Sequence, residues 1–295
     1  MKRELALVSY SSSEDSETES SSQPAKKRKL PVLSSTLVGP PHVDDPSLHQ
    51  GRIRTTPHVD GQYATHIYGS VPLERSSALF KLLCKVIGSA KNAVPTLHDF
   101  WSSPKDCKPE LHISLSRPIF LRSHQREEMK RAVRCIAEKT SPFTASFAHV
   151  SELVNDEGTR IFLALEIGAG HHELSTLTTL LTPALRAMRQ HEYYAAPRFH
   201  ASIGWALLGG RPNSTQGSAS HMDPQSSIRS ESRTSSTALV LDEYPTITGF
   251  PPALLPALNS NYGSSLTGST VKSFEMGEIS IKIGKEVSRY RLNGT

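Results

Sequence analysis

The sequence contains Leu111-His-Ile-Ser-Leu-Ser116, and a second stretch, Phe199-His-Ala-Ser-Ile-Gly-Trp205, has nearly the same pattern. In both, apolar and polar residues alternate, which predicts β-strands. Residues i and i+2 of a strand point to the same face, so each strand offers one imidazole and one hydroxyl on its polar face. The apolar residues between them would pack the other face against a core.

The bare pattern His-x-Ser/Thr carries no information by itself. Because 62 of the 295 residues are Ser or Thr, 13 histidines should produce about three matches by chance, and three occur, the third being His149-Val-Ser151. Alternation also fits amphipathic strands whose polar faces meet water. Only if the strands of His112 and His200 lie side by side do two imidazoles and two hydroxyls converge on one cleft.

Such a cleft is suited to breaking a phosphodiester. One neutral imidazole takes a proton from the attacking hydroxyl, and the other, as imidazolium, gives a proton to the leaving oxygen. Histidine titrates near pH ~6.5, so both forms exist at neutral pH. The serine hydroxyls can hold the non-bridging oxygens. A metal site would need further ligands, and no H-x-H or H-E-x-x-H spacing occurs, so we predict neither a metal nor another cofactor.

The rest of the sequence alternates between predicted strands and helices. Strands are predicted at 63–68, 111–121, 143–154, 160–167 and 199–207, with one or two closing strands in 271–283, and helices at 76–87, 126–139 and 174–188. Two rounds of strand, helix and histidine-bearing strand predict an α+β fold with a pseudo-duplicated architecture.

The N-terminal region has the composition of a disordered tail. Residues 11–22 hold seven Ser, one Thr and four acidic residues, which cannot form a core. The basic run at 26–29 that follows is typical of a nuclear localisation signal, although a solvated run of charges has the same pattern. We expect a tail at 1–50.

A second biased stretch lies near the C-terminal third. Twelve of the 26 residues 213–238 are Ser or Thr, which predicts a surface loop, and we extend this loop through the proline-rich 251–256 region. One domain is expected at 51–295, with a low-complexity loop insertion at about 209–243.

Several protein classes are excluded by composition. Cys84, Cys107 and Cys135 are an odd number without a C-x-x-C spacing, which argues against a disulfide scaffold. No apolar run reaches the length of about 20 residues that a membrane helix needs, and the N-terminus lacks the features of a signal peptide. We expect a soluble intracellular protein, and the net charge of +5 permits an anionic partner without requiring one.

The paired motifs resemble the 2H phosphoesterase superfamily and, within it, the U6 small nuclear RNA phosphodiesterase family. The resemblance extends to Gly51-Arg-Ile-Arg-Thr55, Ala64-Thr-His-Ile-Tyr68, Arg160-Ile-Phe-Leu-Ala-Leu-Glu166 and the segment 194–205, which follow in the family's order. It covers roughly 51–208 and, more weakly, 271–292. It implies a two-lobed fold of antiparallel sheets flanked by helices around a central cleft.

The resemblance also implies roles for individual residues. His112 and His200 would be the general acid and base, in an order left open, and Ser114 and Ser202 would bind the phosphate. Tyr194 matches an aromatic residue that stacks on the terminal base, although a tyrosine here could instead cap a helix or pack in the core; its neighbour Tyr193 provides the comparison. His149 falls outside the paired motifs, so we assign it to structure.

The implied activity is a metal-independent 3′→5′ RNA exonuclease acting on the oligouridine 3′ end of U6 small nuclear RNA. It would leave a 2′,3′-cyclic phosphate, which some members open to a monophosphate. The implied protein is a nuclear monomer with RNA as its partner and no membrane association. Two alternatives stay open, a phosphodiesterase acting on small 2′,3′-cyclic nucleotides or tRNA-splicing intermediates, and a nuclear RNA-binding module without turnover.

Overall fold

The computed structural model describes residues 45–53, 56, 59–101, 109–209, 244–268, 271 and 273–294, all of which belong to one compact unit, Asp44–Thr295. The predicted disordered tail at 11–22, the basic run at 26–29 and residues 210–243 of the predicted insertion lie outside the described residues. The domain boundaries therefore stay predictions.

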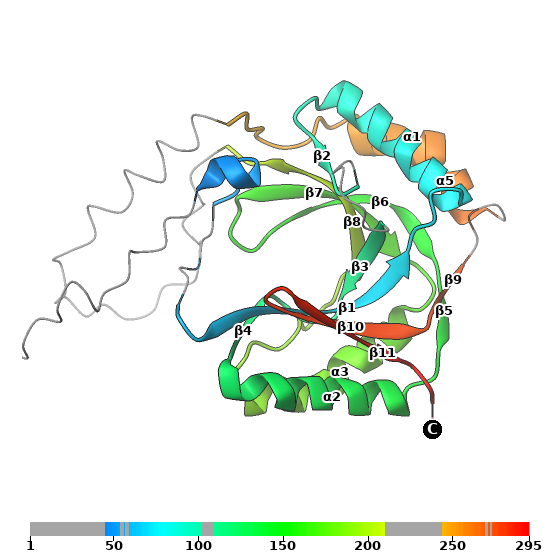
Figure 1. Cartoon of the computed structure of the whole chain (residues 1–295). Coiled ribbons are helices and arrows are strands. Elements are labelled where there is room, and N and C mark those ends of the chain that lie inside the picture. Colours follow the sequence, from blue (N-terminus) through cyan, green and yellow to red (C-terminus); the bar gives the residue numbers. More distant parts are fainter. Residues whose placement is uncertain are drawn as a thin grey trace, which may run out of the picture. The chain divides into compact units, whose positions relative to one another are not determined.

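Antiparallel strands form the frame of the unit (Figure 1). In chain order they are β1 (Gln62–Pro72), β2 (His98–Asp99), β3 (Glu110–Ser114), β4 (Ile119–Arg122), β5 (Phe143–Ala145), β6 (Phe147–Val154), β7 (Arg160–Ile167), β8 (His200–Leu207), β9 (Phe274–Met276), β10 (Glu278–Ile283) and β11 (Glu286–Arg291). Within the described ranges the main sheet has the order β11-β10-β1-β3-β8-β7-β6, with β4 paired to β1 and β2 to β8. The short strands β5 and β9 pair separately.

Two groups of helices cover the two halves of the sheet. The helices are α1 (Ala78–Ala93), α2 (Arg126–Lys139), α3 (His171–Ala187) and α5 (Leu254–Thr267), with short 3₁₀ turns η1 (Pro46–His49) and η2 (Ser123–Gln125). Helices α1 and α5 pack together and contact β8 and β6, whereas α2 packs against α3, β10 and β11. Figure 1 shows these groups at opposite ends of the unit. The predicted α+β fold with two lobes is confirmed.

The core lies between the sheet and both helix groups. The leucine stripe that predicts α3 is fully buried, since Leu174, Leu177, Leu181 and Leu185 have no exposed surface. Each such side chain contributes about 1.5–3 kcal/mol to the free energy of folding. The apolar residues of the motif strands, including Ile113 and Ala201, belong to the same core cluster. The motif histidines and serines therefore occupy the opposite face of the sheet.

Two predicted strands are interrupted. The predicted strand 111–121 is divided into β3 and β4 by the non-strand residues 115–118, which end in Pro118, a residue with no N–H for a ladder hydrogen bond. The predicted strand 143–154 is divided at Ser146 into β5 and β6, and β5 pairs with β9 rather than with the main sheet.

The prediction of a loop through 251–256 is wrong in its second half. Helix α5 begins at Leu254, with Ala253 as its N-cap residue after Pro251 and Pro252. Pro256 lies in the first turn, where backbone N–H groups have no partner in the helix, so proline costs little there. The helix is held by burial of Leu254, Leu258 and Leu266. Strand β11, which pairs with β10, was not anticipated from the sequence.

Candidate active site

Strands β3 and β8 are neighbours, as the convergence of the two motifs requires. Ile113 pairs with Ala201 in an antiparallel register. One step along each strand places His112 opposite Ser202 and Ser114 opposite His200. Directly opposite residues share a face and have Cβ atoms about 4.5–5.5 Å apart. The four residues singled out from the sequence therefore form one compact group on the face away from the core.

Strand β1 supplies a third histidine that the sequence analysis did not assign to the site. His66 Nε2 lies 2.9 Å from Ser114 Oγ. Burial, together with the charges of His112 and Lys282, lowers the pKa of His66 to about 4. His66 is therefore neutral at neutral pH and can hold the Ser114 hydroxyl without adding a charge. The i, i+2 series of His66, Tyr68 and Ser70 in β1 was the available signal.

His112 lies in a crowded network. Its Nε2 is 2.8 Å from Glu110 Oε1, two residues earlier on the same face of β3. The Tyr68 ring packs on the imidazole with a centroid distance of 3.9 Å. The network thus fixes both the plane of the His112 ring and the direction of one of its nitrogens.

The Glu110 carboxylate is itself held by four side chains, those of His112, Tyr68, Ser70 and Arg289. Ser70 Oγ donates to Glu110 Oε2 over 2.7 Å, and Arg289 of β11 donates to the same oxygen over 3.0 Å. Burial would raise the pKa of Glu110, but the hydrogen bonds from Ser70, His112 and Arg289 outweigh it and hold the pKa below its ordinary value. Glu110 is therefore a carboxylate at neutral pH, and it faces His112 as a hydrogen-bond acceptor.

The surroundings of His200 are different. Its Nδ1 donates to the Arg198 carbonyl over 2.6 Å, which leaves Nε2 of the neutral ring with a lone pair. Burial lowers the pKa of His200, the charge of Arg198 adds to the effect, and the backbone hydrogen bond and Glu166 oppose it. The Arg198 guanidinium is ion-paired with Glu166, which lies opposite His200 on β7. His200 is thus oriented by a backbone carbonyl and has no direct carboxylate partner among the described residues.

His149 lies in the same row of the sheet, opposite Glu166 on β6. Its Nε2 is 3.5 Å from Glu166 Oε2, and its side chain is half exposed. Two strand spacings, about 10 Å, separate it from His200. His149 is therefore outside the compact group, and its structural role stays a prediction.

The serines of the two motifs also differ. Ser114 Oγ is bonded to His66, whereas for Ser202 no side-chain hydrogen bond is found within the described part of the chain. The second serine of the first motif, Ser116, is buried and accepts a hydrogen bond from the Ile67 N–H over 3.0 Å, so it joins the segment after β3 to β1. Ser116 is therefore structural, and Ser202 is free to meet a ligand.

Tyr194 and Tyr193 point to different surroundings, as neighbouring residues should. Tyr193 stacks on Phe199 with a centroid distance of 5.6 Å and packs against the core. Tyr194 is 43% exposed, and its hydroxyl donates to Asp156 Oδ1 over 2.9 Å. The Arg117 guanidinium lies 4.8 Å from the Tyr194 ring centre. Tyr194 is therefore not a core residue.

Among the described residues, no group of three or more His, Cys, Asp or Glu side chains could hold a metal ion. Cys84 and Cys135 are exposed free thiols, and Cys107 lies outside the described ranges. No helix in the described part of the chain is long and apolar enough to span a bilayer.

Sequence comparison with known proteins shows the family of this chain. Residues 29–290 match the family HVSL, described as an uncharacterised conserved protein. The Mus musculus protein named U6 snRNA phosphodiesterase 1 is 31% identical over 192 residues, covering 62% of this chain and 67% of that protein. The protein of the same name from Drosophila melanogaster is 30% identical over 235 residues, covering 69% and 83%.

Among solved structures, Kluyveromyces marxianus Usb1 with uridine monophosphate matches with 16% identity and a TM-score of 0.45, covering 78% of this chain and 98% of that chain. The family assignment rests on the sequence comparisons. The chain belongs to the HVSL family, together with the proteins named U6 snRNA phosphodiesterase 1.

Proposed function

We propose that this protein is a metal-independent RNA phosphodiesterase that trims the oligouridine 3′ end of U6 small nuclear RNA and leaves a 2′,3′-cyclic phosphate. The pairing of Ile113 with Ala201 carries the proposal, because it gathers two histidines and two serines, all partly buried, on the face of the sheet away from the core. The names of the curated relatives support the choice of substrate.

His200 is the general base and His112 the general acid in this proposal. The free Nε2 of His200 takes the proton from the 2′-hydroxyl of the penultimate nucleotide, whose oxygen attacks the adjacent phosphorus. The bond from phosphorus to O5′ of the terminal nucleoside breaks, and that oxygen receives a proton from the His112 imidazolium. The Nε2–H of the His112 imidazolium donates a hydrogen bond to Glu110, so the proton on Nδ1 is the one available for transfer to the leaving oxygen.

Ser114 and Ser202 hold the non-bridging oxygens of the reacting phosphate. If His66 Nε2 donates to Ser114 Oγ, the Ser114 hydroxyl keeps its own proton for a phosphate oxygen. The Ser202 hydroxyl lies opposite His112 in the strand register and donates a hydrogen bond to the other non-bridging oxygen. Hydrogen-bond donors placed in advance stabilise the charge that develops in the transition state.

Tyr194 provides a stacking surface for the terminal base. Its exposure and its position beside Arg117 support this role over packing in the core. Stacking of one base on an aromatic ring contributes about 1–3 kcal/mol and tolerates changes in base identity. Tyr193, packed on Phe199, lies in the core cluster instead.

The proposed setting is the nucleus, since the substrate is a nuclear RNA and the basic run at 26–29 is typical of an import signal. We further propose a monomer without membrane association, with a tail at 1–50 and a domain at 51–295 that carries the insertion at about 209–243.

The experiment is trimming of two uridine-tailed RNAs by the purified full chain. One RNA is all ribose, and the other has a 2′-deoxy sugar at the penultimate position, which removes the nucleophile. The expected result is shortening of the first RNA and no loss of the terminal nucleoside from the second. Equal shortening of both would contradict the proposal. Faster turnover of small 2′,3′-cyclic nucleotides would favour a cyclic phosphodiesterase, and RNA binding without product a non-catalytic module.

A further inference from the structure

The functional face of the sheet continues beyond the catalytic group along β8. Ser202 pairs with Ala164 of β7, and Trp205 pairs with Phe162, two residues from Ala164 on the same strand. The register shift between Leu163 and Ala164 absorbs the extra residue of β8. Trp205 and Phe162 therefore share the face of Ser202, about 7–10 Å farther along the strand.

Two arginines lie on these two rings. The guanidinium of Arg52 is 5.2 Å from the Trp205 ring centre, and that of Arg160 is 5.4 Å from the Phe162 ring centre. His98 stacks on Trp205 with a centroid distance of 4.5 Å. The result is two cations on a wall of aromatic rings, next to the reacting group.

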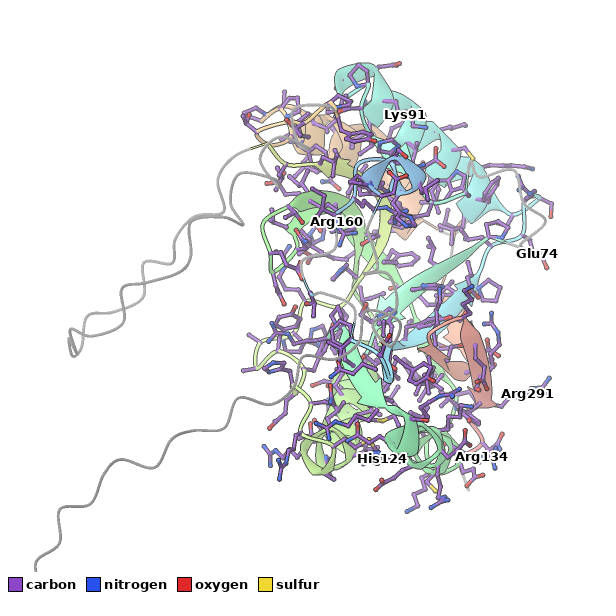
Figure 2. The ribbon with its side chains drawn as sticks, turned by 60° about the vertical axis from the view of Figure 1, so that its left-hand side comes forward. Glu74, Lys91, His124, Arg134, Arg160 and Arg291 are labelled. Carbon is purple, nitrogen blue, oxygen red and sulfur yellow. The ribbon has the colours of Figure 1, made fainter. Side chains whose placement is uncertain are left out.

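The local backbone brings Arg52 to this place. Gly51 has a φ of +78°, and a Cβ there would lie 2.7 Å from Leu207 Cδ1, so only glycine allows the chain to pass so close to β8. Arg52 Nε donates to the His49 carbonyl over 2.9 Å, which fixes the guanidinium. Arg160 begins β7, is partly buried, and lies in the upper half of the unit in Figure 2.

Neither guanidinium has a carboxylate within ion-pair distance among the described residues. By contrast, Arg117, Arg198 and Arg289, which flank the catalytic group, each bond a carboxylate. Burial lowers the pKa of Arg160, and the charge of Arg52 lowers it further, with only a smaller opposing effect of Glu157. The fold thus brings two like charges together, and a bound anion would relieve their repulsion.

We infer that Arg52 and Arg160 bind an RNA phosphate on the 5′ side of the scissile one, an inference that rests on the proposed function. Arginine presents several N–H donors that match the oxygens of a phosphate. The Trp205 and Phe162 rings hold the planes of the two guanidinium groups. Because the enzyme cleaves at the last phosphate of the RNA, all remaining phosphates lie on the 5′ side of the cleaved bond. The two rings under these arginines lie about 7–10 Å from Ser202 along the strand, so the phosphate they bind is a different one from the reacting phosphate.

The inference predicts an effect that depends on RNA length. Arg52→Gln combined with Arg160→Gln should weaken binding of an uncleavable oligouridine, 2′-deoxy at its penultimate sugar, by about 10–100-fold. The slope of log affinity against log salt should fall by about 0.7 for each phosphate that the two side chains no longer neutralise. Cleavage of the dinucleotide UpU, which has no second phosphate, should stay within about twofold of the wild type.

A matched control is Arg134→Gln. Arg134 lies on the Tyr290 ring at 5.3 Å, the same type of contact, and Figure 2 shows it at the lower end of the unit, away from Arg160. This variant should bind oligouridine as the wild type does. A single Arg160→Lys variant keeps the positive charge but lacks the guanidinium group. It should bind oligouridine more tightly than the double variant and more weakly than the wild type, and it serves as the test if the double variant does not fold.

The outcomes separate the two proposals. The phosphate site is overturned if the double variant binds oligouridine as tightly as the wild type. It is also overturned if Arg160→Lys loses UpU cleavage by the same factor as it loses oligouridine binding. Wild-type protein that binds oligouridine with the stated dependence on both arginines but cleaves neither RNA overturns the catalytic function and leaves the phosphate site standing.

Discussion

The two halves of the site start from the same sequence motif and end in different surroundings. On β3, His112 is held by a carboxylate, a tyrosine ring and, through Glu110, by Ser70 and Arg289. On β8, the Nδ1 of His200 donates to one backbone carbonyl, and its Nε2 has no hydrogen-bond partner among the described residues. A motif therefore places an imidazole, but the neighbouring strands decide whether that imidazole is suited to give or to take a proton.

The largest effect tests whether both halves are needed. His112→Ala and His200→Ala should each lower the rate of trimming by about 10²–10⁴-fold, because each removes one of two proton transfers. Both side chains lie on the polar face, so the melting temperature should change little. The measurement is single-turnover trimming at neutral pH. Trimming at the wild-type rate in either variant would contradict the claim that His112 and His200 act together as general acid and general base.

The second prediction concerns the buried histidine of the His112 half. His66 has a pKa of about 4 in the folded chain, against about 6.5 when unfolded. Above pH ~6.5 the ring is neutral in both states, and between these values only the unfolded chain takes up the proton. The contribution of His66 to the free energy of unfolding should therefore fall by about 3 kcal/mol from pH ~6.5 to pH ~4.

The control for this prediction is a pair of variants. His66→Gln should lose that part of the pH dependence in urea unfolding, and His149→Gln, at a half-exposed side chain, should keep it. An unchanged pH dependence in His66→Gln would show that the proton uptake belongs to other groups.

The third prediction compares the two carboxylates. Glu110→Gln should lower kcat by about tenfold with a smaller effect on KM, because the hydrogen bond that aligns His112 is weakened. Glu166→Gln should change kcat by less than about threefold, since Glu166 acts on Arg198 and the His200 ring is aligned by a carbonyl. Equal losses in the two variants would contradict the difference between the halves.

The smallest effect is a displacement of the pH profile. His200 must be neutral to act as a base, and burial with the Arg198 charge lowers its pKa, so the acid limb of kcat/KM should lie below pH ~6.5. Arg198→Gln removes the charge and releases Glu166, so this limb should move to higher pH. Arg186→Gln, which breaks an exposed pair with Glu192, should leave the profile in place. A limb that moves to lower pH would contradict the assignment of His200 as the base.

Much of the fold could be predicted from local patterns. The alternation around His112 and His200 indicated the correct faces, because Ile113 and Ala201 are buried. The leucine stripe of α3 indicated its burial. Helix α5 was missed because Pro251, Pro252 and Pro256 suggest a loop, although prolines are tolerated before a helix and in its first turn.

The partners of the site residues could not be predicted, because they come from distant strands. Glu110 was within two residues of His112, but its role became visible only with Arg289, which is 179 residues away on a strand that the pattern did not show. His66 meets Ser114 across a pairing of β1 with β3 that no local period specifies. Side-chain alternation identifies a face, whereas long-range strand pairing determines its neighbours.

The most direct test of the central claim is mass spectrometry of a uridine-tailed RNA after incubation with the full chain in EDTA. Catalysis by two histidines predicts RNA shortened by whole uridine nucleotides and ending in a 2′,3′-cyclic phosphate or its opened monophosphate. The first product released should be uridine with a free 5′-hydroxyl, and each later product should be uridine that also carries, at its 3′ side, the cyclic phosphate or monophosphate left by the preceding round. RNA that stays intact until a divalent metal is added, or that ends in a free 3′-hydroxyl, would contradict it.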